Sequence, residues 1–458
     1  MRISIVAVGS ATLAVICMAS IASAQTGWWR TYGGPSDDDG RSIQQTADDG
    51  YIVAGWTKSF GAGYADVCLI KTNAQGDSLW VRTYGGPNQD GGNSVQQTTD
   101  GGYIIAGGSG SFGAGLYDVY LVKTDASGDT LWTRTYGGTD QDMGNSVQQT
   151  ADGGYIITGC TKSFGAGNWD VYLVKTNALG DTVWTRTYGG AQSDWGYSVQ
   201  QTADSGYVIA GYGAGNADVY LIKTNAQGDT LWTRTYGGSR QDVAYSLQLT
   251  ADGGYIIAGE TDSYGAANGD VYLIKVNPQG DTLWARTYGG PNYDDGRSVQ
   301  QTTDGGYVIA GITQSFGAGN SDVYLVKINA LGDTVWTATY GGPQSDAGYS
   351  VQQTADGGYV VSGGTYSFGA GTPDSDNVYL IKTDSLGTVG VLEENPGQQA
   401  VGRKPAATVV RRLPQGASVF DALGRRVQHP RPGVYFVREP QAQAQAQAQA
   451  TRKVLLVE

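Results

Sequence analysis

The chain has 458 residues, with 29 Lys and Arg against 42 Asp and Glu, and its formal net charge is −13. An acidic protein of this kind lacks the basic surface that binds nucleic acid or an anionic membrane, so we expect neither as a partner. The single histidine is His429, near the C-terminus, which excludes a His-based catalytic dyad or triad from the first 390 residues.

The first 24 residues carry the features of a secretory signal. Arg2 precedes a long apolar run that starts at Ile3, and the run ends in Ala22-Ser23-Ala24. Small residues at these last positions are typical of a signal cleavage site. We therefore predict residues 1–24 to be a signal peptide that is cleaved between Ala24 and Gln25, and we expect export through the periplasm.

One sequence unit of about 52 residues then recurs seven times. Its signature is Trp-x-Arg-Thr-Tyr-Gly-Gly, in which an alanine replaces the arginine of the last copy. A fixed period of this length is typical of a solenoid, a propeller or an array. The fourth unit is shorter than the others by four residues. The signature begins at Trp28, Trp80, Trp132, Trp184, Trp232, Trp284 and Trp336.

Each unit offers four short segments with strand chemistry. In the second unit they are 94–98, 103–107, 118–124 and 129–136. Asp-Gly-Gly joins the first two and Ala-Ser-Gly the last two, and glycine supplies the positive φ of tight hairpin turns. The first segment is polar, as expected for a strand that lines a wet channel, whereas the next two are apolar on both faces. Four antiparallel strands repeated seven times predict an all-β fold, a seven-bladed β-propeller.

The two ends of the array predict how the ring closes. Residues 27–32 supply only a fourth strand, whereas residues 350–383 supply three strands without a fourth. Pairing the two ends closes the ring and removes exposed sheet edges. We therefore predict that residues 25–390 form the propeller, with the N-terminal strand completing the seventh blade.

After residue 390 the composition changes. Residues 391–418 are rich in Pro, Gly, Arg and Gln and are expected to form a linker, and 441–450 are a low-complexity Gln-Ala repeat. Strands are predicted at 419–427, 433–438 and 451–457. Their motifs, Asp-x-x-Gly-Arg, Gly-Val-Tyr-Phe and Lys-Val, resemble in that order the C-terminal sorting domain of type IX secretion cargo. The resemblance implies that residues 419–458 form a small β-rich sorting domain that the outer-membrane secretion machinery recognises.

The repeat itself also resembles a known group. Asp-Gly-Gly-Tyr-Ile-Ile-Ala-Gly and Asp-Val-Tyr-Leu-x-Lys-x-Asn-x-x-Gly-Asp are similar to motifs of the delta-60-like and related bacterial propeller repeats. The similarity extends from residue 27 to about residue 387. It implies a secreted propeller, and it names no ligand because a fold alone does not settle function.

Two repeated features allow both a structural and a binding interpretation. The Trp, Arg and Tyr of the fourth strand share one face and could stack on sugars, but we expect them to pack between blades. An aspartate also precedes the opening serine of each blade by four residues. A ring of carboxylates could bind cations, but we expect each to cap a turn, so no metal is predicted. The seven aspartates are Asp38, Asp90, Asp142, Asp194, Asp242, Asp294 and Asp346.

Nearly all variation between units falls on the face that carries the blade-to-blade connections and the loops between second and third strands. Trp195, Tyr197 and Tyr245 are aromatic at variable positions there, beside Asp194 and Asp242. The shortened loop of the fourth unit is expected to leave a gap next to them. The rings could stack on a sugar while the carboxylates bind its hydroxyls. Alternatively, the rings merely cover the ends of the blades.

These observations predict a monomeric, secreted or surface-attached binding protein for a glycan or a partner protein, without a cofactor. The alternative is a glycan-active enzyme, a hydrolase or lyase, which needs two carboxylates held across one substrate. No unit carries an acid-base pair of its own that the other units lack, so we predict that the protein is not an enzyme.

Overall fold

A computed structural model gives the structure of the protein. It describes residues 27–213, 217–266, 269–370 and 375–389 in full, and the backbone of 408–410, 418–420, 433–438 and 451–456. The predicted signal peptide with its cleavage site at Ala24 and Gln25 lies outside the described residues, as does the Gln-Ala repeat. The chain divides into two units, residues 1–390 and 391–458.

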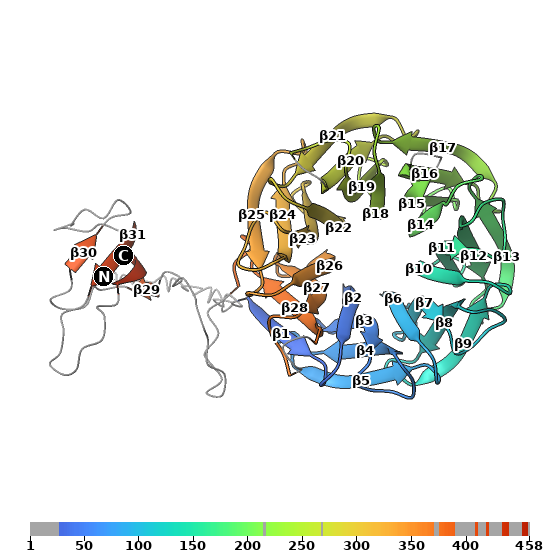
Figure 1. The fold of residues 1–458 in the computed structure, drawn as a ribbon, viewed down its shortest axis with the longest axis horizontal. Coiled ribbons are helices and arrows are strands. Elements are labelled where there is room, and N and C mark those ends of the chain that lie inside the picture. Colours follow the sequence, from blue (N-terminus) through green and yellow to red (C-terminus); the bar gives the residue numbers. More distant parts are fainter. Residues whose placement is uncertain are drawn as a thin grey trace, which may run out of the picture. The chain divides into compact units, whose positions relative to one another are not determined.

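The first unit is a ring of seven four-stranded antiparallel sheets, as predicted (Figure 1). From the channel outward, blade 1 consists of β2 (Asp38–Gln45), β3 (Tyr51–Thr57), β4 (Asp66–Thr72) and β5 (Ser78–Tyr84), and blade 2 of β6 (Asp90–Gln97), β7 (Tyr103–Ser109), β8 (Asp118–Thr124) and β9 (Thr130–Tyr136). Blade 3 consists of β10 (Asp142–Gln149), β11 (Tyr155–Thr161), β12 (Asp170–Thr176) and β13 (Thr182–Tyr188), and blade 4 of β14 (Trp195–Gln201), β15 (Tyr207–Gly213), β16 (Asp218–Thr224) and β17 (Thr230–Tyr236). Blade 5 consists of β18 (Asp242–Leu249), β19 (Tyr255–Thr261), β20 (Asp270–Val276) and β21 (Thr282–Tyr288), and blade 6 of β22 (Asp294–Gln301), β23 (Tyr307–Thr313), β24 (Asp322–Ile328) and β25 (Thr334–Tyr340). Blade 7 consists of β26 (Asp346–Gln353), β27 (Tyr359–Thr365), β28 (Asn377–Thr383) and β1 (Trp28–Tyr32).

The first strand of a blade begins earlier than its sequence predicts. In blade 2 it starts at Asp90 rather than at Ser94. The register shifts between Gly92 and Ser94, so Asn93 is the extra residue of a β-bulge. A bulge interrupts the alternation of side chains from which strands are recognised, and it re-aims the inserted residue. The residues before the bulge belong to the strand although their sequence resembles a loop.

Neighbouring blades are joined by the fourth strand of one and the hairpin of the next. Between blades 1 and 2, the ring centroids of Trp80 and Tyr103 are 6.0 Å apart, and the Tyr84 hydroxyl donates to the Gly128 carbonyl over 2.7 Å. A Cβ on Gly128 would stand 2.8 Å from the Trp80 ring, so only glycine lets the turn pack there. The Trp–Tyr contact and the hydroxyl bond recur at all seven junctions. The predicted packing role of the Trp-x-Arg-x-Tyr face is therefore confirmed.

The polar first strands line the central channel and also bond to one another. The Gln44 side chain accepts a hydrogen bond from the backbone amide of Gln97 in the next blade, over 2.6 Å. An equivalent bond joins each blade to the next around the whole ring. The first glutamine of each Gln-Gln pair, or of Gln-Leu in blade 5, is thus fixed by the assembly, a role that its polarity alone did not predict.

The buried lysine of each third strand forms an ion pair with an aspartate in the hairpin between the first two strands of its own blade. Lys123 is 3% exposed and its ammonium lies 2.8 Å from the Asp100 carboxylate. Burial by itself would raise the pKa of Asp100, but hydrogen bonds from Lys123, Thr98 and the Gly102 amide outweigh it and lower the pKa to about 2. The ion pair therefore places a charged residue in an apolar strand and fixes the Asp-Gly-Gly turn at the same time.

The N-terminal strand closes the ring as predicted. β1 pairs antiparallel with β28, from Trp28 opposite Lys382 to Tyr32 opposite Val378. Trp28 then packs on Tyr51 of blade 1 at 5.8 Å, and the Tyr32 hydroxyl donates to the Gly76 carbonyl over 2.5 Å. The closing strand thus makes the same contacts with the next blade as every other fourth strand does.

The second unit contains a small sheet with the strand order β29-β32-β31-β30. Its strands are β29 (Thr408–Val410), β30 (Ser418–Phe420), β31 (Gly433–Arg438) and β32 (Thr451–Leu456). A strand was predicted at 419–427, of which 421–427 lie outside the described residues. Within the part of the chain that the structure describes, no helix is long and apolar enough to cross a membrane.

Removing residues 25–33 tests ring closure. The deletion leaves β28 with an unpaired edge and removes the Trp28 contact. We therefore expect the propeller to unfold at a lower temperature and to aggregate. The free energy of unfolding should fall by more than the ~3–5 kcal/mol that the loss of one buried Trp costs. Thermal melting with light scattering measures both effects. Deleting residues 441–450 is the control, and a truncated protein that melts like this control would contradict the closure.

Candidate functional site

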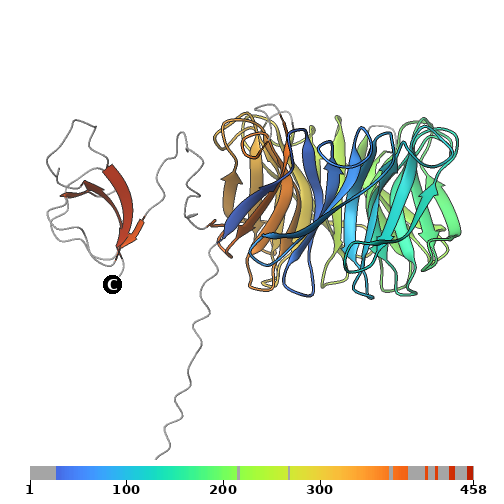
Figure 2. The same cartoon turned by 90° about the horizontal axis from the view of Figure 1, so that it is seen from below.

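The blade-to-blade connections and the loops between second and third strands lie on one face of the ring, which we call the loop face (Figure 2). The seven repeated aspartates cap turns on this face. In blade 2, Asp90 is 0% exposed. One of its carboxylate oxygens accepts hydrogen bonds from the Gly86 amide at 2.8 Å and the Ser111 hydroxyl at 2.6 Å, and the other accepts one from Ser109. The carboxylate thus caps the incoming turn and ties it to the loop that follows β7. This is the capping role that the sequence favoured.

Two residues of the predicted ligand site, Asp194 and Asp242, are buried in the same way. Asp194 and Asp242 are 1% and 0% exposed. The Asp242 carboxylate accepts bonds from the Gly238 amide at 2.8 Å and the Ser263 hydroxyl at 2.7 Å, and the Asp194 carboxylate accepts one from the Gly190 amide at 2.8 Å. Both carboxylates therefore cap turns, as the other repeated aspartates do, and their part in ligand binding stays a prediction. In sequence, an aspartate that caps a turn looks like one that faces a ligand.

The five aspartates that were weighed as cation ligands are buried in the same way. Each is at most 1% exposed and accepts a bond from the amide four residues before it. Across the described parts of the chain, no three His, Cys, Asp or Glu side chains are grouped so that they could hold a metal ion. The five residues are Asp38, Asp90, Asp142, Asp294 and Asp346.

On the loop face, one cross-strand pair of residues differs in sequence from blade to blade. It joins the residue after the repeated aspartate to a residue near the end of the second strand. Sequence comparison of the units singled out the first member of each pair, whereas the second member emerges only from the strand register. The pairs are Asp39–Trp56, Gly91–Gly108, Met143–Cys160, Trp195–Tyr212, Val243–Glu260, Asp295–Ile312 and Ala347–Gly364.

The structure brings the predicted aromatic residues together and adds two more. The ring centroids of Trp195, Tyr197 and Tyr212 are 6.1 to 6.2 Å apart in all three combinations, with interplanar angles of 16° to 29°. Three equidistant rings cannot form one column, so they lie side by side as a stepped surface, which we call the aromatic tile. Trp169 adjoins Trp195 at 4.9 Å, and Tyr245 meets Tyr197 edge-on at 5.3 Å. All five side chains are partly exposed.

Tyr245 belongs to a network of paired charges beside the tile. The Arg297 guanidinium lies 4.1 Å above the Tyr245 ring, and its Nε is 2.7 Å from Asp295. Glu260 accepts hydrogen bonds from the hydroxyls of Tyr293 at 2.8 Å and Tyr245 at 3.1 Å. Burial, more than the nearby Asp295, raises the pKa of Glu260. Tyr245 is therefore held by protein partners and forms a fixed wall of the tile.

A second charged group lies where blades 7 and 1 meet. Arg41 Nε is 2.7 Å from the buried carboxylate of Asp39, and the guanidinium lies 4.4 Å above the Tyr349 ring. Burial raises the pKa of Asp39, and burial together with the charge of Asp39 raises the pKa of Asp376 to about 8. Arg41 is thus the cation that compensates the buried carboxylate of Asp39.

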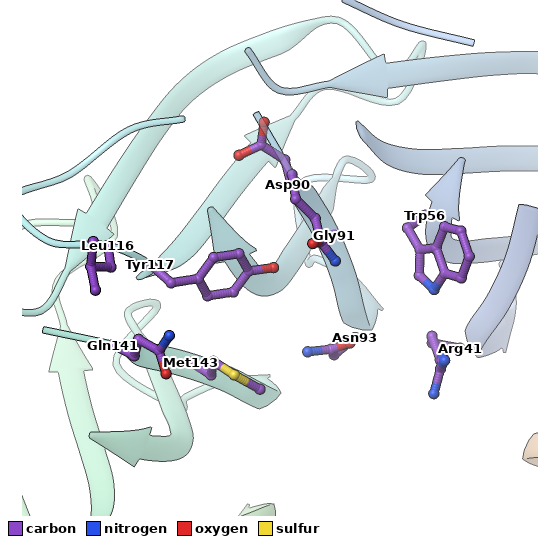
Figure 3. Close-up of a pocket in the computed structure, with 10 residues that line it drawn as sticks. Arg41, Trp56, Asp90, Gly91, Asn93, Leu116, Tyr117, Gln141 and Met143 are labelled. Atoms are coloured by element: carbon purple, nitrogen blue, oxygen red, sulfur yellow. The ribbon is translucent and has the colours of Figure 1, made fainter. Parts of the chain in front are cut away.

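A cavity of about 400 Å³ opens on the loop face over blade 2 (Figure 3). Its walls come from blades 1, 2 and 3 and include Trp56, Tyr117 and Met143. A gap was predicted instead at the shortened loop of blade 4, where residues 214–216 lie outside the described residues. The cavity over blade 2 was missed because Gly91 lies in its floor, and a glycine in a strand carries no obvious functional signal.

The ring of seven blades defines the chain as a β-propeller. No family model matches it. A curated protein that it resembles is the regulatory protein FlaEY of Caulobacter vibrioides, 26% identical over 181 residues, which cover 33% of this chain and 19% of the relative. The aligned part of this chain thus spans about a fifth of that relative's length.

Solved structures with a similar fold are distant in sequence. The Pan2 WD40 domain of Neurospora crassa is 9% identical, with 79% of this chain and 98% of that chain covered and a TM-score of 0.47. YCF48 bound to a D1 peptide is 11% identical, with 78% and 94% covered and a TM-score of 0.44. Sqt1 from Chaetomium thermophilum is 11% identical, with 74% and 81% covered and a TM-score of 0.44. Because these identities and TM-scores are low, nothing about this chain is argued from the three structures.

Replacing Asp242 with alanine tests its structural role. The change leaves the Gly238 amide and two hydroxyl groups without their acceptor, so the free energy of unfolding should fall by about 3 kcal/mol in urea denaturation. Asp281→Ala, at an exposed residue, should cost less than about 1 kcal/mol. If Asp242→Ala is as stable as the wild type and loses ligand binding, Asp242 belongs to the ligand site after all.

Proposed function

We propose that the protein is an exported binding protein whose aromatic tile stacks on the sugar rings of a glycan. The observation that supports this is the tile itself, three partly exposed rings side by side with Trp169 and Tyr245 as rims. A sugar ring presents C–H groups on its faces, and these are attracted to the negative face of an aromatic ring. A tile of this size offers such contact to more than one orientation of a sugar.

The surroundings of the tile favour a neutral ligand over a charged one. Arg297 and Glu260 have protein partners, so neither presents an uncompensated charge. The hydroxyls of Tyr197 and Tyr212 can exchange hydrogen bonds with the hydroxyls of a sugar. The capped turns beneath keep the rings in place before a ligand arrives, which lowers the entropic cost of binding.

Removing one ring of the tile should weaken glycan binding. For Trp195→Ala and for Tyr212→Ala we expect each dissociation constant to rise roughly 30-fold, the effect of losing about 2 kcal/mol at a central aromatic contact. A glycan array on the purified propeller identifies the ligand, and calorimetry measures its affinity. Ile312→Ala is the matched control, because Ile312 occupies in blade 6 the position of Tyr212 in blade 4. If the wild type binds no glycan, or if both variants bind like the control, the proposal is wrong.

We infer further that residues 419–458 direct export to the cell surface or beyond. Three observations support this: the predicted signal sequence, the ordered motifs of the tail, and the sheet into which β30, β31 and β32 fold. The division of the chain after Gly390 separates this sheet from the propeller, so each can serve its own purpose.

Deleting residues 419–458 tests this inference in a bacterium with a type IX system. We expect the truncated protein to accumulate in the periplasm while its propeller keeps the thermal stability of the full chain, because β29 to β32 contribute no strand to the ring. Fractionation and immunoblotting locate the protein, and a periplasmic enzyme monitors leakage. Deletion of 441–450 is the matched control and should leave export intact. Normal export of the truncated protein would contradict a sorting role.

A further inference from the structure

The geometry points to a second site on the loop face: we propose that the cavity over blade 2 binds one neutral sugar residue between Trp56 and Tyr117. The inference rests on the proposed function in one respect, that the loop face binds glycans. It adds a pocket, distinct from the aromatic tile, and specifies the chemical class of the sugar that the pocket takes.

The cavity is open above Gly91, at a position where every other blade carries a side chain. Gly91 and Gly108 form the variable cross-strand pair of blade 2, which alone has glycine at both positions. A Cβ on Gly91 would meet only the Trp56 Cβ, at 3.7 Å, so the space above it is open. A Cβ on Gly108 would collide with the Tyr117 ring, so Tyr117 occupies part of the space that a side chain would fill.

The walls provide two aromatic surfaces with an amide group between them. Figure 3 shows Trp56 and Tyr117 on opposite sides of Gly91 and Asn93. The Asn93 amide nitrogen donates to the Gly144 carbonyl over 2.9 Å, which fixes the side chain. Burial and the charge of Asp90 raise the pKa of Tyr117 to about 12, so its hydroxyl remains a donor at physiological pH. Aromatic walls with a few fixed polar groups are the usual composition of a small-ligand site.

The charged groups at the cavity have partners in the protein. Arg41 is paired with Asp39 at 2.7 Å and stacks on Tyr349. The Asp90 carboxylate is buried and accepts hydrogen bonds from Gly86, Ser109 and Ser111. A charged ligand would have to break these pairs or remain uncompensated, which is costly in a partly buried site. The cavity therefore suits a neutral, polyhydroxylated ligand with an apolar ring face.

Its size agrees with this class. The volume of about 400 Å³ falls at the lower end of the roughly 300–1,000 Å³ that small-molecule sites span. The cavity therefore accommodates a sugar residue at the end of a chain better than a long internal segment.

Filling the cavity with Gly91→Trp tests the proposal. The same position carries Trp195 in blade 4, and the Gly91 backbone has no positive φ that would oppose a side chain. The probes are the methyl glycosides of glucose, galactose and mannose, N-acetylglucosamine, and glucuronate, titrated by calorimetry into the propeller. We expect at least one neutral probe to bind the wild type, and Gly91→Trp to weaken it about 100-fold or more by occupying its place. Ala347→Trp, at the same position of blade 7, is the matched control for the added indole.

Trp56→Ala is a second variant that tests the same cavity if Gly91→Trp does not fold. It removes one wall without adding volume and should weaken the same probe roughly 30-fold, whereas Ile312→Ala, at the equivalent position of blade 6, should not. The proposal is overturned if no neutral probe binds the wild type, or if the folded cavity variants bind as the controls do. It is also overturned if glucuronate binds more tightly than every neutral probe and Arg41→Ala abolishes that binding.

The tile variants separate this inference from the proposed function. If Trp195→Ala loses glycans on the array while Gly91→Trp keeps them all, the proposed function stands and the pocket is not a sugar site. If Gly91→Trp loses a neutral probe that Trp195→Ala still binds, the pocket is confirmed and the tile is not needed for that sugar.

Discussion

The structure depends on the contact between the fourth strand of one blade and the hairpin of the next. Adjacent blades belong to separate sheets, so no backbone ladder joins them. The junction consists of a tryptophan that packs on the neighbouring tyrosine, a tyrosine hydroxyl that donates to a hairpin carbonyl, and a hairpin glycine that leaves room for the indole. Seven such junctions require seven fourth strands. The last must come from the other end of the chain, which explains why β1 lies beside β28.

Several features that recur in all seven repeats were predicted correctly from the sequence. Strand number, ring closure and the packing role of the fourth strand follow from period, polarity and glycine placement, which local chemistry determines. The start of the first strand was predicted less well, since the bulge at Asn93 disturbs the alternation by which strands are recognised. The glutamine ring was also missed, because its bonds run between sheets and depend on how closely the blades approach.

The candidate site was predicted only in part, because some of its residues come from positions that sequence comparison did not single out. Trp195, Tyr197 and Tyr245 occupy variable positions of one loop type, so the topology alone places them near one another. Tyr212 completes their cluster from the second strand of blade 4, and Trp169 from the loop that follows the second strand of blade 3. The strand register reveals the first, and the approach of the two blades reveals the second. For Asp194 and Asp242 the structure shows a capping role that residue type does not reveal, because turn geometry decides whether a carboxylate meets a backbone amide or the solvent.

The repeated frame allows individual blades to differ without loss of the fold. The stabilising contacts lie at the channel, the hairpins and the blade junctions, away from the one cross-strand pair that varies. Blades 1 and 6 both carry Asp-Asp-Gly-Arg, yet the Ile312 amide donates to Asp295 Oδ1 over 3.0 Å, whereas Asp39 Oδ1 has no hydrogen-bond partner among the described residues. The same aspartate therefore has different hydrogen-bond partners in blades 1 and 6.

This separation of frame and variable pair gives the loop face two ways to make a binding surface. Blade 4 carries large rings at both positions of the pair and produces the aromatic tile, whereas in blade 2 the cavity opens above Gly91. Both involve the same variable pair, and neither disturbs the capped turns beneath, because Asp90 and Asp194 cap their turns alike. The two sites that we propose on this face therefore depend on the variable pair, while the frame that holds them is shared by all seven blades.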